Sequence, residues 1–136
     1  MNMKQEDIVN EIRRMCGQTF PLPSLAGWHF MYNRQVYVYV AGKDESMIRI
    51  NIPFVAGLLA PNAERMKEAV NETNRNVKYI KAMFSENGGA KVSLDYDHKI
   101  TASVSAKEIV PHIIHSLDYA AGYLKKRVDA KTEKQK

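Results

Sequence analysis

His112, His115 and Asp118 come nearest to a metal-binding set in type and spacing. Three-residue intervals place them on one helical face, and imidazole and carboxylate groups are common zinc ligands. The adjacent Ile113 and Ile114 are typical of the border of a hydrophobic core, and neither a cysteine nor a third motif completes a ligand set. We therefore expect boundary residues here and no bound metal.

Asp95 and Asp97, followed by His98, are the second group with the types needed for chemistry. In a strand the two carboxyl groups share a face, where one could act as an acid and the other as a base. No nucleophile or phosphate-binding loop accompanies them, and Gly88-Gly89 does not belong to a dinucleotide or Walker pattern. A solvated strand edge is the expected structure, so the sequence predicts no enzyme, no catalytic residue and no cofactor.

Cys16 is the single cysteine, so an internal disulfide is impossible. It follows Ile8, Ile12 and Met15 on the apolar face of an expected helix over residues 6–16. We expect a small core residue rather than a reactive thiol, in a protein of a reducing compartment.

Three strands are expected after a loop over residues 18–27. They cover residues 28–32, 35–40 and 47–52, and Asn33-Arg34 supplies a tight turn. In the second strand valines at 36, 38 and 40 alternate with tyrosines, and in the third isoleucines at 48, 50 and 52 alternate with Met47, Arg49 and Asn51. The two aliphatic sets are predicted to be buried together against helices.

The second half of the chain predicts a helix from about Asn62 to Asn76, then strands over 79–84 and 90–96 joined at Asn87-Gly88-Gly89. Ser105 and Glu108 form a capping box for a long last helix, within which Pro111 predicts a later start or a kink. The order α-β-β-β-α-β-β-α indicates an α+β fold, with an antiparallel sheet packed against helices. We expect a single domain over 1–128 and a charged tail over 129–136.

A surface is the stronger functional signal. If the aliphatic faces are buried, the other side presents a set of residues of the types enriched at protein interfaces, with the strand over 79–84 contributing either Tyr79 and Met83 or Ile80 and Phe84. An internal cover, from residues 53–61 or the first helix, remains the alternative. The predicted partner-binding residues are Tyr37, Tyr39, Met47, Arg49, Tyr79 and Met83.

Single-stranded nucleic acid is an alternative partner, which would bind through the aromatic sheet face and the basic tail, because bases stack on exposed tyrosines. The distribution of charge does not favour it. Of the net charge of +5, the last twelve residues carry +4 and residues 1–124 carry +1, so the body of the protein is nearly neutral. A nucleic-acid binder more commonly carries a basic face on its folded domain.

The chain resembles the YbjN-like group of bacterial proteins, which share the fold of type III secretion chaperones. The similarity rests on the hairpin VYVYVAGKDESMIRINIPF over 36–54, on NETNRNVKYIKAMF over 71–84, and on the order of elements. Asn71 and Asn74 before Lys78 and Lys81 match the N-x-x-N and V-K pattern of the group. The resemblance implies a non-enzymatic, chaperone-like binding module, commonly a homodimer, whose sheet receives a segment of another protein. Secretion chaperones tend to be acidic, and the sequence pI of about 9.3 departs from that pattern.

Composition and the ends of the chain indicate the compartment. The 136 residues are 45% hydrophobic and 26% charged, as in a globular domain. Residues 1–7 are polar and no apolar segment follows them, so no signal peptide is predicted. The longest apolar stretch, residues 52–60, contains Pro53 and Gly57 and is too short to span a bilayer. We expect a cytoplasmic protein that does not use a membrane.

Overall fold

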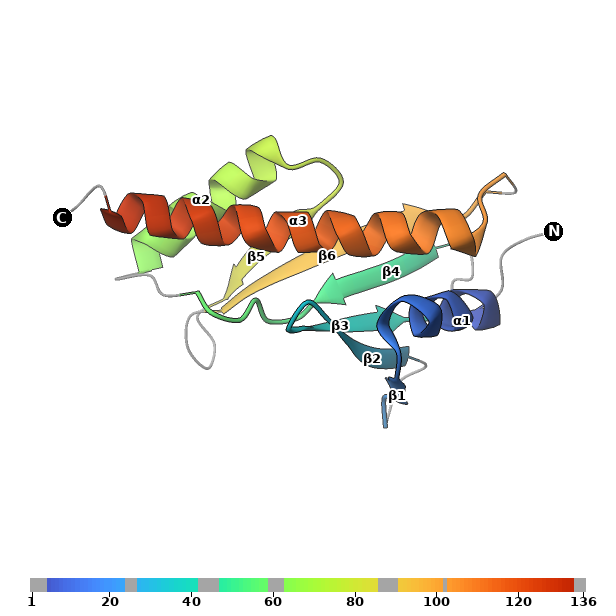
Figure 1. Cartoon of the computed structure of the whole chain (residues 1–136). Coiled ribbons are helices and arrows are strands. Elements are labelled where there is room, and N and C mark those ends of the chain that lie inside the picture. Colours follow the sequence, from blue (N-terminus) through green and yellow to red (C-terminus); the bar gives the residue numbers. More distant parts are fainter. Residues whose placement is uncertain are drawn as a thin grey trace.

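A computed structural model describes residues 5–23, 27–41, 47–58, 63–85, 91–101 and 103–133, and in them three helices accompany six antiparallel strands (Figure 1). In chain order the elements are α1 (Gln5–Cys16), β1 (Thr19–Pro21), β2 (Gly27–Tyr32), β3 (Gln35–Val40), β4 (Met47–Ile52), α2 (Ala63–Asn76), β5 (Lys81–Ser85), β6 (Lys91–Lys99) and α3 (Ala106–Glu133). The predicted α+β fold is confirmed.

The helix ends follow local sequence signals. Gly17, at a φ of 86°, closes α1 with a bond from its N–H to the Arg13 carbonyl. Ser105 precedes α3 at the N-cap position, and its carbonyl accepts hydrogen bonds from the N–H groups of Glu108 and Ile109. The helix starts before Pro111 and runs through it, so the predicted later start is wrong.

The sheet has the order β1-β2-β3-β4-β6-β5. β2 and β3 form a hairpin in which Asn33 and Arg34 both have positive φ, at 49° and 65°. Two such residues make the turn whose twist matches that of paired strands. The chain then passes from β4 through α2 to the outer strand β5, and β6 returns between β5 and β4.

All three helices contribute to one layer on one side of the sheet, and α3 runs along it, with α1 and α2 packed against α3 (Figure 1). Burial alternates along the strands accordingly. One side, the core face, is buried under the helices. The other side, the open face, is formed by Phe20, His29, Met31, Val36, Val38, Val40, Met47, Arg49, Asn51, Lys81, Met83, Ser93, Asp95, Asp97 and Lys99.

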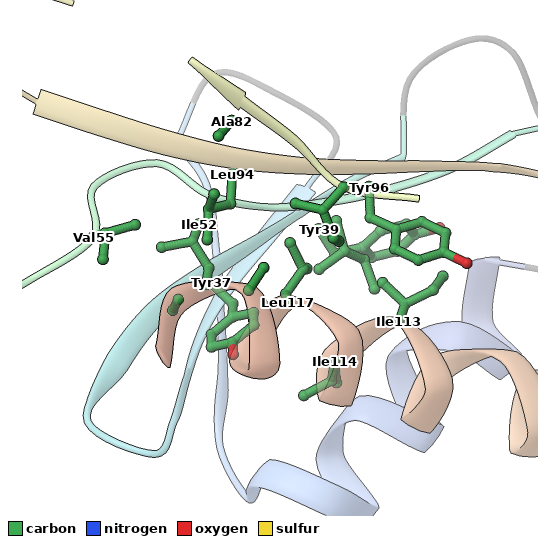
Figure 2. Close-up of a cluster of buried hydrophobic side chains, with 14 of the residues drawn as sticks. Tyr37, Tyr39, Ile52, Val55, Ala82, Leu94, Tyr96, Ile113, Ile114 and Leu117 are labelled. Atoms are coloured by element: carbon green, nitrogen blue, oxygen red, sulfur yellow. The ribbon is translucent and has the colours of Figure 1, made fainter. Parts of the chain in front are cut away.

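The hydrophobic core lies between the core face and α3. Of three α3 side chains labelled in Figure 2, Ile113 and Leu117 are directed at the strands that carry Leu94 and Tyr96, whereas Ile114 is directed to the side of α1. All three α3 side chains are fully buried. A buried Leu or Ile side chain of this kind contributes about 1.5–3 kcal/mol relative to exposure, so α3 is the main cover of the sheet.

The structure reverses the predicted orientation of β3. Tyr37 and Tyr39 are buried on the core face, whereas Val36 is exposed and Val38 and Val40 are half-buried on the open face. The register explains this, because Tyr39 pairs with Ile50, and a shift of one residue would exchange the faces.

Aromatic packing supplies the physical reason for that register. Tyr39 stacks on Trp28 at 5.7 Å between ring centroids, and Tyr37 stacks on Phe30 at 5.5 Å. Burying two tyrosines removes more apolar surface from water than burying two valines.

Other boundaries differ by short segments. Residues 19–21, predicted as loop, form β1, and Asp97 to Lys99, also predicted as loop, extend β6. Helix α3 continues beyond the expected domain boundary at 128 to Glu133. The predicted turn at 87–89, the expected helix start at Asn62 and the final residues 134–136 lie outside the described residues.

Two side-chain amides join the sheet to neighbouring segments through backbone hydrogen bonds. The Asn74 Nδ2 donates to the Ala82 carbonyl at 2.9 Å, and its Oδ1 accepts from the Ala82 N–H at 2.7 Å. Gln35 bonds in the same manner to the Phe54 carbonyl and the Ala56 N–H. Asn74 therefore fixes α2 to β5, and Gln35 fixes the connector after β4.

Candidate functional site

The open face is built by register. One row of paired residues crosses all six strands, in the order Phe20, His29, Val38, Asn51, Asp95 and Lys81. The row is apolar and aromatic over β1 to β3 and charged over β6 and β5. The open face therefore has an apolar half and a polar half.

The apolar half exposes large side chains. Phe20 is 45% exposed, Met31 50% and Val36 40%. Met31 and Val36 are paired across β2 and β3, and Phe20 stacks on His29 at 5.1 Å. Large apolar side chains that gather on a surface mark interaction sites more often than they mark inert surface.

Charges of both signs occupy the polar half. The Arg49 Nε lies 3.9 Å from the Asp97 Oδ1, and both side chains are more than half exposed, so the pair contributes little to stability. Burial and the neighbouring Asp97 carboxylate raise the pKa of Asp95, against the opposing effect of Lys81. These groups are arranged as a mixed-charge patch of the kind that gives specificity at the rim of an interface.

The six predicted partner-binding residues separate into three groups. Met47, Arg49 and Met83 lie on the open face, as the prediction requires. Tyr37 and Tyr39 are wrong as surface residues, because both are buried in the core. Tyr79 does not share the open face with Met83, because it precedes strand β5.

Tyr79 precedes β5, in the connector from α2. Its φ of 70° is in the left-handed region, where a bulky residue is strained by about 1–3 kcal/mol. Its ring lies 6.1 Å from Tyr96 and 6.0 Å from His112, both between centroids, yet the residue is 71% exposed. Tyr79 thus belongs to the layer of the helices, beside α3.

The residues considered for a metal site have separate contacts. His112 packs against Tyr79 and Tyr96, and His115 lies 6.1 Å from the Tyr32 ring. Asp118 Oδ1 accepts a hydrogen bond of 2.8 Å from Asn33 at the β2–β3 turn. Within the part of the chain that the structure describes, no group of three or more His, Cys, Asp or Glu residues could hold a metal ion.

Cys16 is half-buried at the end of α1, and burial raises the pKa of its thiol to about 11. Near neutral pH the group is therefore almost entirely protonated, and a thiol is a far weaker nucleophile than a thiolate.

Sequence reasoning missed Phe20, His29, Met31 and Val36, the apolar half of the open face. The alternation in residues 28–32 contained the signal. His29 and Met31 alternate with Trp28, Phe30 and Tyr32, so the three aromatic rings share the opposite face. A strand with three large rings on one side buries that side, and the paired strand must then bury its tyrosines too.

Comparisons with known proteins identify the fold. No family model matches the sequence, and no curated protein matches it. Among solved structures, YbjN of E. coli, described as a candidate transcription regulator, superposes with a TM-score of 0.68 and 9% identity, over 93% of this chain and 92% of that chain. An uncharacterized protein from Methanothermobacter thermautotrophicus superposes with a TM-score of 0.57 and 14% identity, over 91% and 98% of the two chains. The predicted YbjN-like fold is confirmed.

The length and composition of the helices decide whether one of them could span a membrane. Among the described residues, no helix combines the length and the apolarity that crossing a bilayer requires.

Proposed function

We propose that this chain is a cytoplasmic, non-enzymatic protein-binding module that receives a segment of another protein chain on its open face and forms a homodimer. The observation that carries the proposal is the apolar half of the open face, where Phe20, Met31 and Val36 are 40–50% exposed on adjacent strands. A second protein chain would remove this surface from water, which is the main driving force of association.

The polar half supports a protein as the partner. Arg49 and Asp97 present opposite charges side by side, and Lys81 lies opposite Asp95 in the next pair of strands. Such a mixed pattern matches a polypeptide segment that has charges of both signs. The candidate regulator role in the description of YbjN is also one that a protein can fulfil by binding alone.

Single-stranded nucleic acid is the less favoured partner. The alternative required Tyr37 and Tyr39 on an exposed face, and both are buried. Acidic Asp95 and Asp97 also interrupt the basic residues of the open face, which would repel phosphate groups.

The test places charge in the centre of the apolar half. The double variant Met31→Lys, Val36→Lys should shift the protein from dimer to monomer in light scattering and should lose the proteins that wild type retains from nuclease-treated native extract. Both side chains are exposed, so the melting temperature should change by no more than a few degrees.

Phe54→Lys is the matched control, because Phe54 is a comparably exposed apolar residue that belongs to neither the open face nor the layer of the helices. It should keep the mass and the partners of wild type. A double variant that keeps both would contradict the proposal, and partners lost only on nuclease treatment would favour nucleic acid.

A further inference from the structure

A cavity of about 370 Å³ lies between the end of α2 and the face of α3, away from the open face. The connector supplies Lys78 and Tyr79, and α3 supplies His112, His115, Ser116 and Tyr119. Its volume falls in the range of pockets that hold small molecules.

The two tyrosine side chains that line this cavity are exposed to solvent. Tyr79 is 71% exposed and Tyr119 63% exposed, the two highest values among the exposed large hydrophobic side chains of the described residues. The backbone of Tyr79 has a positive φ, a conformation that bulky residues rarely adopt. Strained residues of this kind cluster at ligand sites.

The α3 side of the cavity is presented by one face of the helix. Positions 112, 115, 116 and 119 are positions i, i+3, i+4 and i+7 of the helix, so their side chains project from one stripe. That stripe offers two imidazoles, a hydroxyl and a phenol to the same small volume.

The charge of the lining has one sign. Lys78 contributes an ammonium group and the two histidines contribute N–H donors, while the described residues that line the cavity include no carboxylate. A ligand with a negative group would be complementary to this set, and a flat ring would be complementary to exposed tyrosines.

We propose that this cavity binds a small planar aromatic anion. Lys78 pairs with the negative group, His112, His115 and Ser116 donate hydrogen bonds, and the rings of Tyr79 and Tyr119 contact the aromatic plane. Two sources share this chemistry, aromatic carboxylates and nucleoside monophosphates, and the test separates them.

The experiment titrates the full-length, ¹⁵N-labelled protein with 4-hydroxybenzoate and with AMP, and follows the backbone amides of residues 76–79 and the ring protons of the two histidines. At least one of the two anions should shift these signals in a saturable way. The neutral analogues 4-hydroxybenzyl alcohol and adenosine, and the bare anions acetate and phosphate, should each bind at least tenfold more weakly. The anion that binds more tightly identifies the source.

Two lysines provide a matched pair of variants. Lys78→Gln should weaken binding about tenfold, whereas Lys81→Gln, three residues later on the open face, should leave it unchanged. Tyr119→Ala should abolish saturation, and unshifted amides on the open face would show that the fold is intact. The proposal is wrong if neither anion shifts residues 76–79, if the neutral analogues bind equally well, or if Lys78→Gln binds as wild type does.

Discussion

At the scale of single residues, Tyr37 shows how a residue type that suggests recognition can serve the core instead. Its ring is fully buried, stacks on Phe30 and meets Tyr32 edge-on. Within the described part of the chain its hydroxyl has no hydrogen-bond partner, and burial raises its pKa. The ring therefore stabilises the fold, while the hydroxyl costs free energy.

Tyr37→Phe should accordingly keep or raise the free energy of unfolding, by up to about 1 kcal/mol, because it removes an unpaired polar atom and keeps the ring. Tyr37→Ala should lower it by about 3–5 kcal/mol, as large-to-small aromatic changes in cores do. Urea unfolding followed by circular dichroism measures both. An unfolded or weakened Tyr37→Phe would show that the hydroxyl has a partner.

At the scale of elements, the turn of the β2–β3 hairpin has the twist that paired strands favour, but Arg34 is a residue type that disfavours the positive φ of this turn. Asn33 tolerates positive φ and ties the turn to α3 through Asp118, but Arg34 has a β-carbon that opposes its φ of 65°. Glycine is the preferred residue at this position of such a turn.

Arg34→Gly should therefore raise the free energy of unfolding by about 0.5–1 kcal/mol and the melting temperature by a few degrees. Arg34→Ala removes the same guanidinium but keeps the β-carbon, so it should give no such gain. Thermal unfolding of the two variants beside wild type is the measurement. An equal gain from alanine would attribute the effect to charge instead of backbone strain.

The elements themselves were largely predictable, whereas the face that β3 buries was not. Periodicity located α1, β2, β3 and β4 to within a residue, because amphipathic patterns and the Asn33-Arg34 turn are local signals. The three-residue β1 has no pattern of its own and depends on pairing with β2. The face of β3 depends on its register with β4, a non-local property, so alternation in β3 alone could not decide between valine and tyrosine.

Because strand register is a non-local property, only some residues of the candidate site could be predicted from the sequence. Met47, Arg49 and Met83 were placed correctly, whereas Tyr37 and Tyr39 were assigned to the wrong face. The cavity beside Tyr79 could not be foreseen, since it joins a connector to a helix more than 30 positions later in the chain.

At the scale of the whole molecule, several buried groups share one response to pH. Burial raises the pKa of Cys16 to about 11 and that of Tyr39 to about 12, and it also raises the pKa of Tyr37 and Tyr96. The folded state keeps these protons longer than the unfolded chain does. The resulting stability is complete below the unfolded-state values, roughly pH 9–10, and is lost as the pH rises toward 11–12.

We therefore expect a free energy of unfolding that is nearly constant between pH 7 and 9 and falls steeply above about pH 10. Urea unfolding across this range gives the curve, and tyrosinate absorbance should show a late phase that coincides with loss of structure. Tyr39→Phe should make the decline shallower. A stability curve that stays flat to pH 12 would contradict the burial of these groups.

The amide of Asn74 has a consequence for assembly. A strand at the margin of a sheet invites β-augmentation, in which an extended polypeptide adds itself to the free backbone groups, and uncontrolled addition leads to aggregation. At Ala82 both outward groups of β5 are already engaged by one side chain. An incoming strand would have to displace that amide before it could continue the ladder. The Asn74 amide therefore protects β5 at Ala82 against uncontrolled addition of a strand.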